Sequence, residues 1–197
     1  MKILLLLLSA LALHVQAAVD RPEVRLGTGT LQGVVEGNML AFKGIPYAAP
    51  PVEEFRWRPP QAVKSWTGLR DASKFGAACP QPYVKGLNDG MTPGSEDCLK
   101  LNVFTPKAGK NLPVMVWIHG GGLLVDAAKD AQFTPFSLIK NGVIVVTFDY
   151  RMGTFGFFAP KELIDEAKAK GEPAGNYGIM DQITALKWVK NNIQAFG

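Results

Sequence analysis

The feature that most constrains the fold is a run of five apolar residues followed by one histidine and three glycines. Val114–Ile118 is apolar without alternation, which predicts a strand of a parallel sheet covered on both faces. His119 and Gly120 to Gly122 follow directly. Because glycine has no Cβ, its backbone can take a positive φ, and a bound atom can come close to its N–H groups. The stretch predicts either a loop that donates backbone hydrogen bonds to a ligand or a flexible strand-to-helix connection.

A second apolar run places this strand in an α/β fold. Residues 143–148 are mostly β-branched and predict another buried strand. Between the two strands, Thr134-Pro135 can begin a helix, which should end near Asn141-Gly142. Two parallel strands joined through a helix form a right-handed βαβ unit, so we expect an α/β protein.

The remaining elements follow from turn residues and periodicity. Residues 24–37 predict a hairpin broken by glycines, and residues 99–104 alternate as in a half-buried strand. The prolines and aromatic residues of 42–60 predict an irregular segment. Residues 160–170 predict a polar helix closed by Gly171. A last, amphipathic helix should pack on the sheet through apolar residues at 3.6-residue spacing, namely Ile179, Ile183, Leu186, Val189, Ile193 and Phe196.

The N-terminus predicts export. Lys2 precedes a short apolar run, and Val15-Gln16-Ala17 offers small residues where a signal peptide is cleaved. We expect residues 1–17 to be removed and residues 18–197 to belong to one secreted domain; the alternative is a buried N-terminal helix. The formal charge of +4 would become +3 without Lys2, and the basic residues are scattered. Nucleic acid and membrane surfaces are therefore not expected partners, and no transmembrane segment is predicted.

Cys79 and Cys98 are the only cysteines. In an exported chain such a pair predicts a disulfide, and the segment between them, rich in Gly, Pro, Asn and Asp, predicts a surface loop. A metal site would need more ligands than the chain offers, and we expect no cofactor.

Five segments together resemble the type-B carboxylesterase family, which includes cholinesterases, secreted animal lipases and insect esterases. The resemblance implies the N-terminal part of an α/β-hydrolase fold, with a β-hairpin region and an incomplete central sheet, in a serine esterase that acts on small carboxylic esters. The segments are Phe42 to Pro51, Ser95 to Val103, the His119 glycine loop, Tyr150 to Phe157, and Gly175 to Val189.

The resemblance also implies roles for individual residues. Gly121 and Gly122 match the two glycines that donate N–H groups to the oxyanion. Cys79 and Cys98 match a disulfide, and Arg56 and Glu96 match a buried ion pair.

Three departures from the family pattern bear on specificity. Glu53 stands where a glycine is usual, and Leu123 stands where an aromatic residue is usual. The segment between the cysteines contains no Trp, the residue that holds a quaternary ammonium in cholinesterases. Selectivity for choline esters is therefore not expected.

The catalytic triad is absent from the 197 residues. No serine lies in a Gly-x-Ser-x-Gly elbow, and His119, the only histidine after residue 17, is predicted to be a locally bonded loop residue rather than the base. The resemblance implies that nucleophile, acid and base lie beyond Gly197. We therefore expect this chain to be inactive by itself and to leave strand edges and apolar surface uncovered.

Three hypotheses remain open at this point. The chain can be the N-terminal part of a secreted serine carboxylesterase, a fragment of a non-catalytic esterase-like adhesion protein, or a small secreted binding protein. The intact glycine loop favours the first, because a binding surface has no need of an oxyanion hole.

Overall fold

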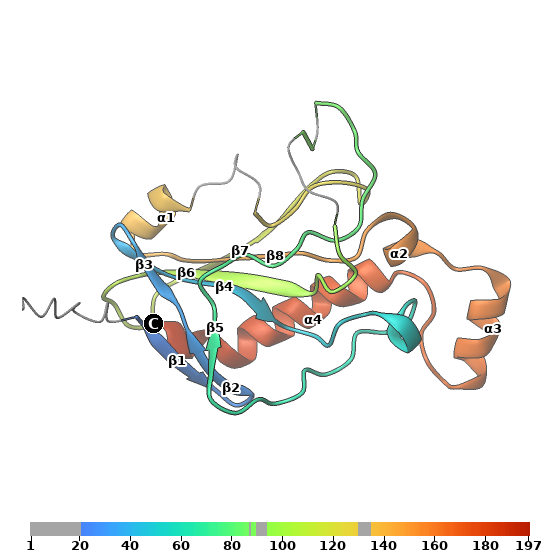
Figure 1. Ribbon diagram of the computed structural model, residues 1–197, viewed down its shortest axis with the longest axis horizontal. Coiled ribbons are helices and arrows are strands. Elements are labelled where there is room, and N and C mark those ends of the chain that lie inside the picture. The colour runs from blue at the N-terminus through green and yellow to red at the C-terminus, as the bar shows by residue number, and fades with distance from the viewer. Residues whose placement is uncertain (1–20, 87, 90–93, 130–134) are drawn as a thin grey trace, which may run out of the picture.

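The computed structural model describes residues 21–86, 88–89, 94–129 and 135–197. The predicted signal peptide and Thr134 lie outside these residues. Two sheets organise the described part of the chain (Figure 1). The larger one has five strands in the order β3-β4-β6-β8-β7. These strands are β3 (Val34–Glu36), β4 (Met39–Pro46), β6 (Lys100–Pro106), β7 (Val114–Ile118) and β8 (Ile144–Phe148).

Only the last two strands of this sheet run parallel. β7 pairs with β8 from Val114 opposite Ile144 to Ile118 opposite Phe148, whereas β3, β4, β6 and β8 pair antiparallel in turn. The short helix α1 (Phe136–Lys140) lies between β7 and β8 in the sequence and ends just before Asn141 and Gly142, as predicted. The predicted connection of two parallel strands through a helix is thus present.

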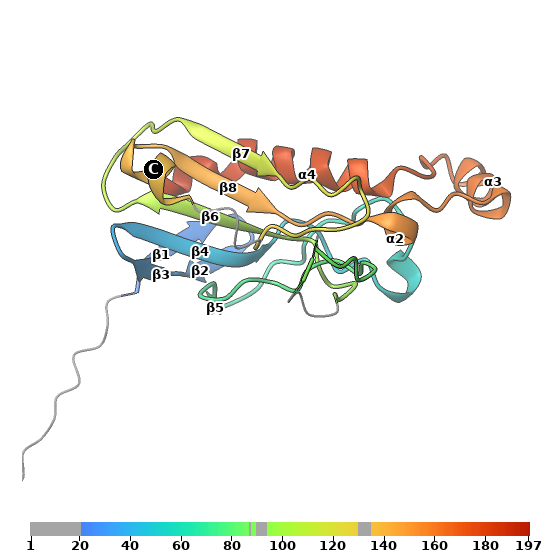
Figure 2. The same cartoon turned by 90° about the horizontal axis from the view of Figure 1, so that it is seen from above.

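A smaller sheet packs beside the first. β1 (Glu23–Leu26) and β2 (Gly29–Gln32) form the predicted glycine-punctuated hairpin, and β5 (Leu69–Asp71) adds to β2 in parallel. Figure 2 shows this sheet on the side away from β7.

Helices cover both faces of the five-stranded sheet. α4 (Tyr177–Asn192) runs along one face, continues into the 3-10 turn η2 (Ile193–Phe196), and packs Ala185, Val189 and Phe196 on the main core. α1 covers the other face through Ile139, against Val145 and Phe104. Strand β8 therefore has all five residues buried, as predicted for a strand covered on both faces.

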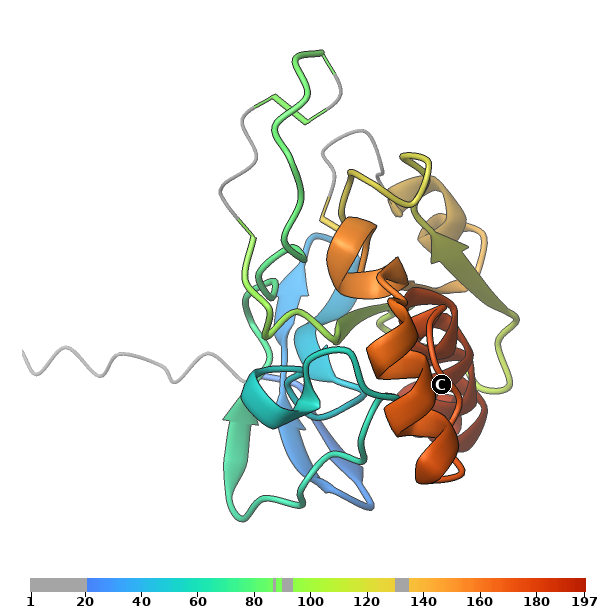
Figure 3. The same cartoon turned by 90° about the vertical axis from the view of Figure 1, so that its right-hand side faces the viewer.

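The remaining helices gather at one end of the sheet (Figure 3). They are the 3-10 turn η1 (Glu53–Phe55), α2 (Gly153–Phe157) and α3 (Lys161–Ala169), with Gly171 at positive φ just after α3, as predicted. Arg58 forms an ion pair with Glu166 and so ties the segment after η1 to α3. Within the described residues, no helix is both long and apolar enough to cross a membrane.

Strand β7 is less buried than predicted. Val114, Met115 and Ile118 are 38–45 % exposed, so the expectation that both faces are covered is wrong for this strand. β7 is the last strand in the order and has only β8 beside it. A run of apolar residues predicts what a strand can bury, not whether a neighbour is present.

The predicted buried face of α4 is wrong over its first half. Ile179, Ile183 and Leu186 are exposed, whereas Val189 and Phe196 are buried as predicted. The residues that face the core are instead spaced by four: Tyr177, Asp181, Ala185 and Val189. The reason is an acidic residue inside the core, which apolar periodicity does not register.

That acidic residue is Asp181, which forms a buried ion pair with Arg151. The Asp181 carboxylate accepts bonds from Nε and Nη2 of Arg151 at 2.8 Å each, and from its backbone N–H at 3.1 Å. Arg151 Nη1 donates to the Arg58 carbonyl at 2.9 Å. Both side chains are almost completely buried. Because a buried charge without its partner is costly, this pair fixes the rotation of α4.

Two strands also differ from prediction. β6 is buried on both faces rather than half-buried, because it lies at the centre of the sheet. Residues 42–46, expected to be irregular, belong to β4, and the bulge between Phe42 and Ile45 places the positive φ of Gly44 inside the strand. The segment after them is irregular apart from η1.

The ion pair predicts a large stability difference between two isosteric substitutions. Asp181→Asn should lower the free energy of unfolding by about 3–5 kcal/mol, because it leaves Arg151 charged and buried without a counter-ion. Asp165→Asn, which removes the exposed partner of Lys161, should leave that free energy nearly unchanged. Urea denaturation of the two variants measures both values; equal midpoints would contradict the assigned role of the pair.

Candidate functional site

The glycine loop leaves the end of β7 in a sharply turned conformation. Gly121, Gly122 and Leu123 have φ values of +91°, +62° and +62°. The N–H groups of Leu124 and Val125 both donate to the Gly121 carbonyl, at 3.1 and 3.2 Å. A Cβ at position 121 would overlap the Val125 carbonyl oxygen, whereas one at 122 would meet nothing. Glycine is therefore required at 121 by space and favoured at 122 by backbone conformation.

The N–H groups of both glycines are available to a ligand. Within the described part of the chain, neither Gly121 nor Gly122 donates a hydrogen bond, and both residues are exposed. The far side of the loop is fixed, since the Gly153 N–H at the start of α2 donates to the Leu123 carbonyl at 2.8 Å. The sequence-predicted donors thus lie together on one anchored turn.

His119 packs under the glycine loop and contacts it. Its side chain is buried, its ring stacks on Tyr150 at a centroid distance of 4.4 Å, and Nδ1 lies 3.1 Å from the Gly120 carbonyl oxygen. Tyr150 in turn donates its hydroxyl to the His119 carbonyl at 3.0 Å. Burial raises the pKa of Tyr150, which keeps that donor protonated. The prediction that His119 is a locally bonded loop residue is confirmed.

An apolar hollow opens beside the glycines. It has a volume of about 400 Å³ and lies between the glycine loop and α2. Such a surface next to backbone N–H donors suits a ligand with a polarised oxygen and an apolar body. Its lining residues are Gly122, Leu123, Leu124, Gly153, Thr154, Phe157 and Phe158.

Comparison with known proteins decides the family. The model of the carboxylesterase family matches residues 20–197. The chain belongs to the carboxylesterase family. It is 42% identical to the fumonisin B1 esterase of Sphingopyxis macrogoltabida and 43% identical to the para-nitrobenzyl esterase of Bacillus subtilis, with 97% and 86% of this chain covered.

Solved structures agree with the α/β-hydrolase fold of the family. A PNB esterase structure superposes with a TM-score of 0.78 at 39% identity, and the carboxylesterase EST55 of Geobacillus stearothermophilus with 0.79 at 41% identity. Each alignment covers 90% of this chain, but only 36% and 35% of the other. The two sequence relatives are likewise covered over 36% and 34% of their lengths. This carboxylesterase-family chain therefore spans about a third of the relatives it matches.

The disulfide and the ion pair implied by the resemblance are both present in the structure. Cys79 and Cys98 form a disulfide. Arg56 donates to both carboxylate oxygens of Glu96, at 2.5 and 2.7 Å. The expectation that this pair is buried is wrong, because the two side chains keep 34% and 24% exposure at the surface.

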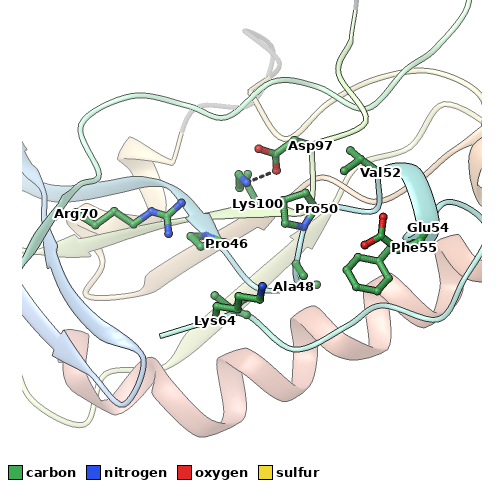
Figure 4. Close-up of a pocket in the computed structure, with 12 residues that line it drawn as sticks. Pro46, Ala48, Pro50, Val52, Glu54, Phe55, Lys64, Arg70, Asp97 and Lys100 are labelled. Atoms are coloured by element: carbon green, nitrogen blue, oxygen red, sulfur yellow. Dashed lines mark hydrogen bonds and ion pairs between the residues drawn. The ribbon is translucent and has the colours of Figure 1, made fainter. Parts of the chain in front are cut away.

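A second cavity, of about 330 Å³, lies away from the glycine loop (Figure 4). Its walls come from Pro46 to Val52, η1 and the start of β6, and an ion pair between Asp97 and Lys100 lies at its rim. It shares no residue with the hollow beside Gly122. In the described residues, no group of three His, Cys, Asp or Glu side chains is placed to hold a metal ion.

Sequence reasoning missed Asp149, the residue directly after β8. It is buried, and its Oδ1 accepts the Ala128 N–H at 2.9 Å. This hydrogen bond holds Ala128, which follows the glycine loop in the sequence, to the end of strand β8. Burial raises the pKa of Asp149 to about 7. An acidic residue directly after a strand of mostly β-branched residues was the available signal.

The buried carboxyl group predicts a pH dependence of stability. The folded state keeps the Asp149 proton up to about pH 7, whereas the unfolded chain releases it near the ordinary pKa of 3.8. The unfolded state binds fewer protons in this window, so the free energy of unfolding should fall as pH rises through it, by at most about 1.4 kcal/mol per unit. Urea denaturation from pH 4.5 to 7 should show this slope reduced in Asp149→Asn and retained in Asp165→Asn. An unchanged slope in Asp149→Asn would contradict the assignment.

Proposed function

We propose that the chain is the N-terminal part of a serine carboxylesterase and supplies the oxyanion hole of that enzyme. The observation that carries the proposal is an anchored turn on which Gly121 and Gly122 are exposed and their N–H groups donate to none of the described residues. The esterase names of the relatives and the family match support it. A protein that serves only adhesion or binding would have no use for this geometry.

In the proposed reaction, a serine outside these 197 residues attacks the carbonyl carbon of a carboxylic ester. The carbonyl π electrons move onto the oxygen, which becomes an oxyanion of the tetrahedral intermediate. Gly121 and Gly122 donate their N–H groups to that oxygen. The base, which took the proton of the serine hydroxyl during the attack, gives it to the alcohol as the intermediate collapses and the alcohol leaves. Water then hydrolyses the acyl-enzyme by the same steps, which releases the acid and restores the serine. Because hydrogen bonds already hold the turn that carries both donors, little reorganisation is needed when the charge develops.

The apolar hollow indicates the kind of substrate. Leu124, Phe157 and Phe158 lie next to Gly122, so the acyl or alcohol group nearest the oxyanion should be apolar. The proposed substrates are therefore small carboxylic esters without a quaternary ammonium group. The reaction as proposed uses no cofactor.

The exposed apolar surfaces support the view that more protein covers this chain. The β7 edge and the outward face of α4 expose Met115, Ile118, Ile179, Ile183 and Leu186. Apolar patches and open strand edges drive association with other protein. We propose that the rest of the esterase domain packs here, and that the isolated chain associates or aggregates.

Export is part of the proposal. Residues 1–17 have the pattern of a signal peptide, and the Cys79–Cys98 disulfide suits an oxidising compartment. We propose that the complete protein is secreted.

The sharpest test removes one donor without changing the shape of the loop. Proline at 122 would be unsuitable, because its ring excludes the φ of +62° found there. Replacing Gly122 by glycolic acid, through nonsense suppression in the complete protein, exchanges the N–H for an ester oxygen. The kcat for p-nitrophenyl butyrate should fall about 10²- to 10³-fold, because one oxyanion donor is lost.

Two controls accompany this measurement. The same replacement at the exposed Gly37, which has a φ of +58° in the turn between β3 and β4, should leave kcat unchanged. The 197-residue chain by itself should not hydrolyse the ester. An unchanged kcat after replacement at 122 would refute the oxyanion role, and a complete protein without esterase activity would refute the function.

A further inference from the structure

Gln81 holds the backbone that follows the glycine loop. It lies in the segment between Cys79 and Cys98, called here the disulfide-closed segment. The Gln81 carboxamide accepts the N–H of Asp126 at 2.7 Å and donates to the carbonyl of the same residue at 2.9 Å. The side chain thus pairs with Asp126 as a neighbouring strand would. The two residues are 45 positions apart, so this contact joins two separate segments of the chain.

The Gln81 carboxamide, which clamps the backbone of Asp126, is itself held in place. Asn88, which is buried, donates to Gln81 Oε1 at 3.2 Å and to the Pro82 carbonyl at 2.8 Å. Gln81 Nε2 also donates to the Cys79 carbonyl at 3.3 Å. The two acceptor positions and two donor hydrogens of the carboxamide are therefore all used, which restricts its rotation.

The disulfide closes the base of this segment. Gln81 is two residues beyond Cys79, which is bonded to Cys98. The Ser95 N–H donates to the Ala78 carbonyl at 2.9 Å, and a Cβ at Gly94 would overlap the Cys79 carbonyl. The chain on both sides of the segment is thus packed tightly where Gln81 begins.

The clamped residue is strained and lies close to the oxyanion donors. Asp126 has a φ of +97°, which is rare for a residue with a side chain, and such a conformation persists only where its surroundings impose it. The preceding residue, Val125, donates its N–H to the Gly121 carbonyl, and its own carbonyl oxygen lies against Gly121. Holding Asp126 therefore holds Val125, and Val125 sets the position of Gly121.

We propose that Gln81 is a positioning residue of the oxyanion hole, through which the disulfide-closed segment fixes the Gly121 turn. Its catalytic consequence rests on the proposed esterase function, whereas its effect on the loop does not. Gln81 touches no reacting atom; it acts through Asp126 and Val125. The hydrogen bonds between Gln81 and Asp126 thus connect the disulfide-closed segment to the turn at Gly121.

The first test measures the loop without reference to activity. In the complete protein, Gln81→Met keeps the length of the side chain and removes the hydrogen bonds to Asp126. Hydrogen exchange of the Leu124 and Val125 amides, followed by NMR, should become about 10- to 100-fold faster, because the turn opens more often. Gln61→Met is the matched control, since Gln61 is exposed and, among the residues that the structure describes, its side chain bonds only to the nearby Pro59 carbonyl. It should leave these amides unchanged.

The second test separates positioning from overall stability. For active sites counted by fluorophosphonate titration, Gln81→Met should lower kcat for p-nitrophenyl butyrate about tenfold or more and leave KM within about twofold, because the donors act mainly in the transition state. Gln81→Met with wild-type kcat per titrated site and wild-type amide exchange would reduce the clamp to a surface contact and overturn the proposal.

The third test is a double-mutant cycle with the disulfide. Cys79→Ser with Cys98→Ser should also speed exchange of the Leu124 and Val125 amides. Adding Gln81→Met to that pair should add little, because both changes break the same link. Additive effects would show that the disulfide does not act through Gln81 and would overturn that part of the proposal. A wild-type protein without esterase activity would refute the proposed function alone, because the exchange measurements would still report the clamp.

Discussion

The buried ion pair between Arg151 and Asp181 connects the sheet, two helices and the glycine loop. Arg151 follows β8, and its carbonyl oxygen lies where a Cβ at Gly156 of α2 or at Gly178 of α4 would overlap it. The two helices therefore approach the same peptide group closely only because both positions are glycine. From α2 the Gly153 N–H reaches the Leu123 carbonyl. The position of the turn at Gly121 and Gly122 thus depends on a charge pair deep in the core.

Apolar patterns predicted the elements better than the way they pack. The β-branched run of β8 identified a strand buried on both faces, and the polar composition and Gly171 identified α3. The rotation of α4 could not be predicted, since Asp181 turns its own face inward against a pattern in which Ile179 and Ile183 are the apolar positions. Periodicity shows which face of a helix is apolar. Whether a charged residue such as Asp181 is buried depends instead on whether the fold brings it a partner of opposite charge.

The functional residues divide in the same way. Gly121 and Gly122 are assigned as candidate donors through the resemblance to the carboxylesterase family, because the strand and glycines by themselves leave a flexible connection open. Gln81 and Asp149 could not be assigned a role, because each holds the backbone of a residue distant in sequence. A single Gln or Asp carries no period and no spacing, so only the three-dimensional contact shows what it does. The outward faces of β7 and α4 are also apolar because of contacts distant in sequence. We propose that other parts of the domain cover these faces.

The central claim is that the turn at Gly121 and Gly122 is built to hold an oxyanion, and the most direct measurement is a crystal structure of the complete protein after reaction with a fluorophosphonate. The phosphoryl oxygen of the adduct stands in for the oxyanion. It should lie about 2.7–3.1 Å from the backbone nitrogens of both Gly121 and Gly122. An adduct whose phosphoryl oxygen points away from this turn, with the two N–H groups bonded elsewhere, would contradict the account.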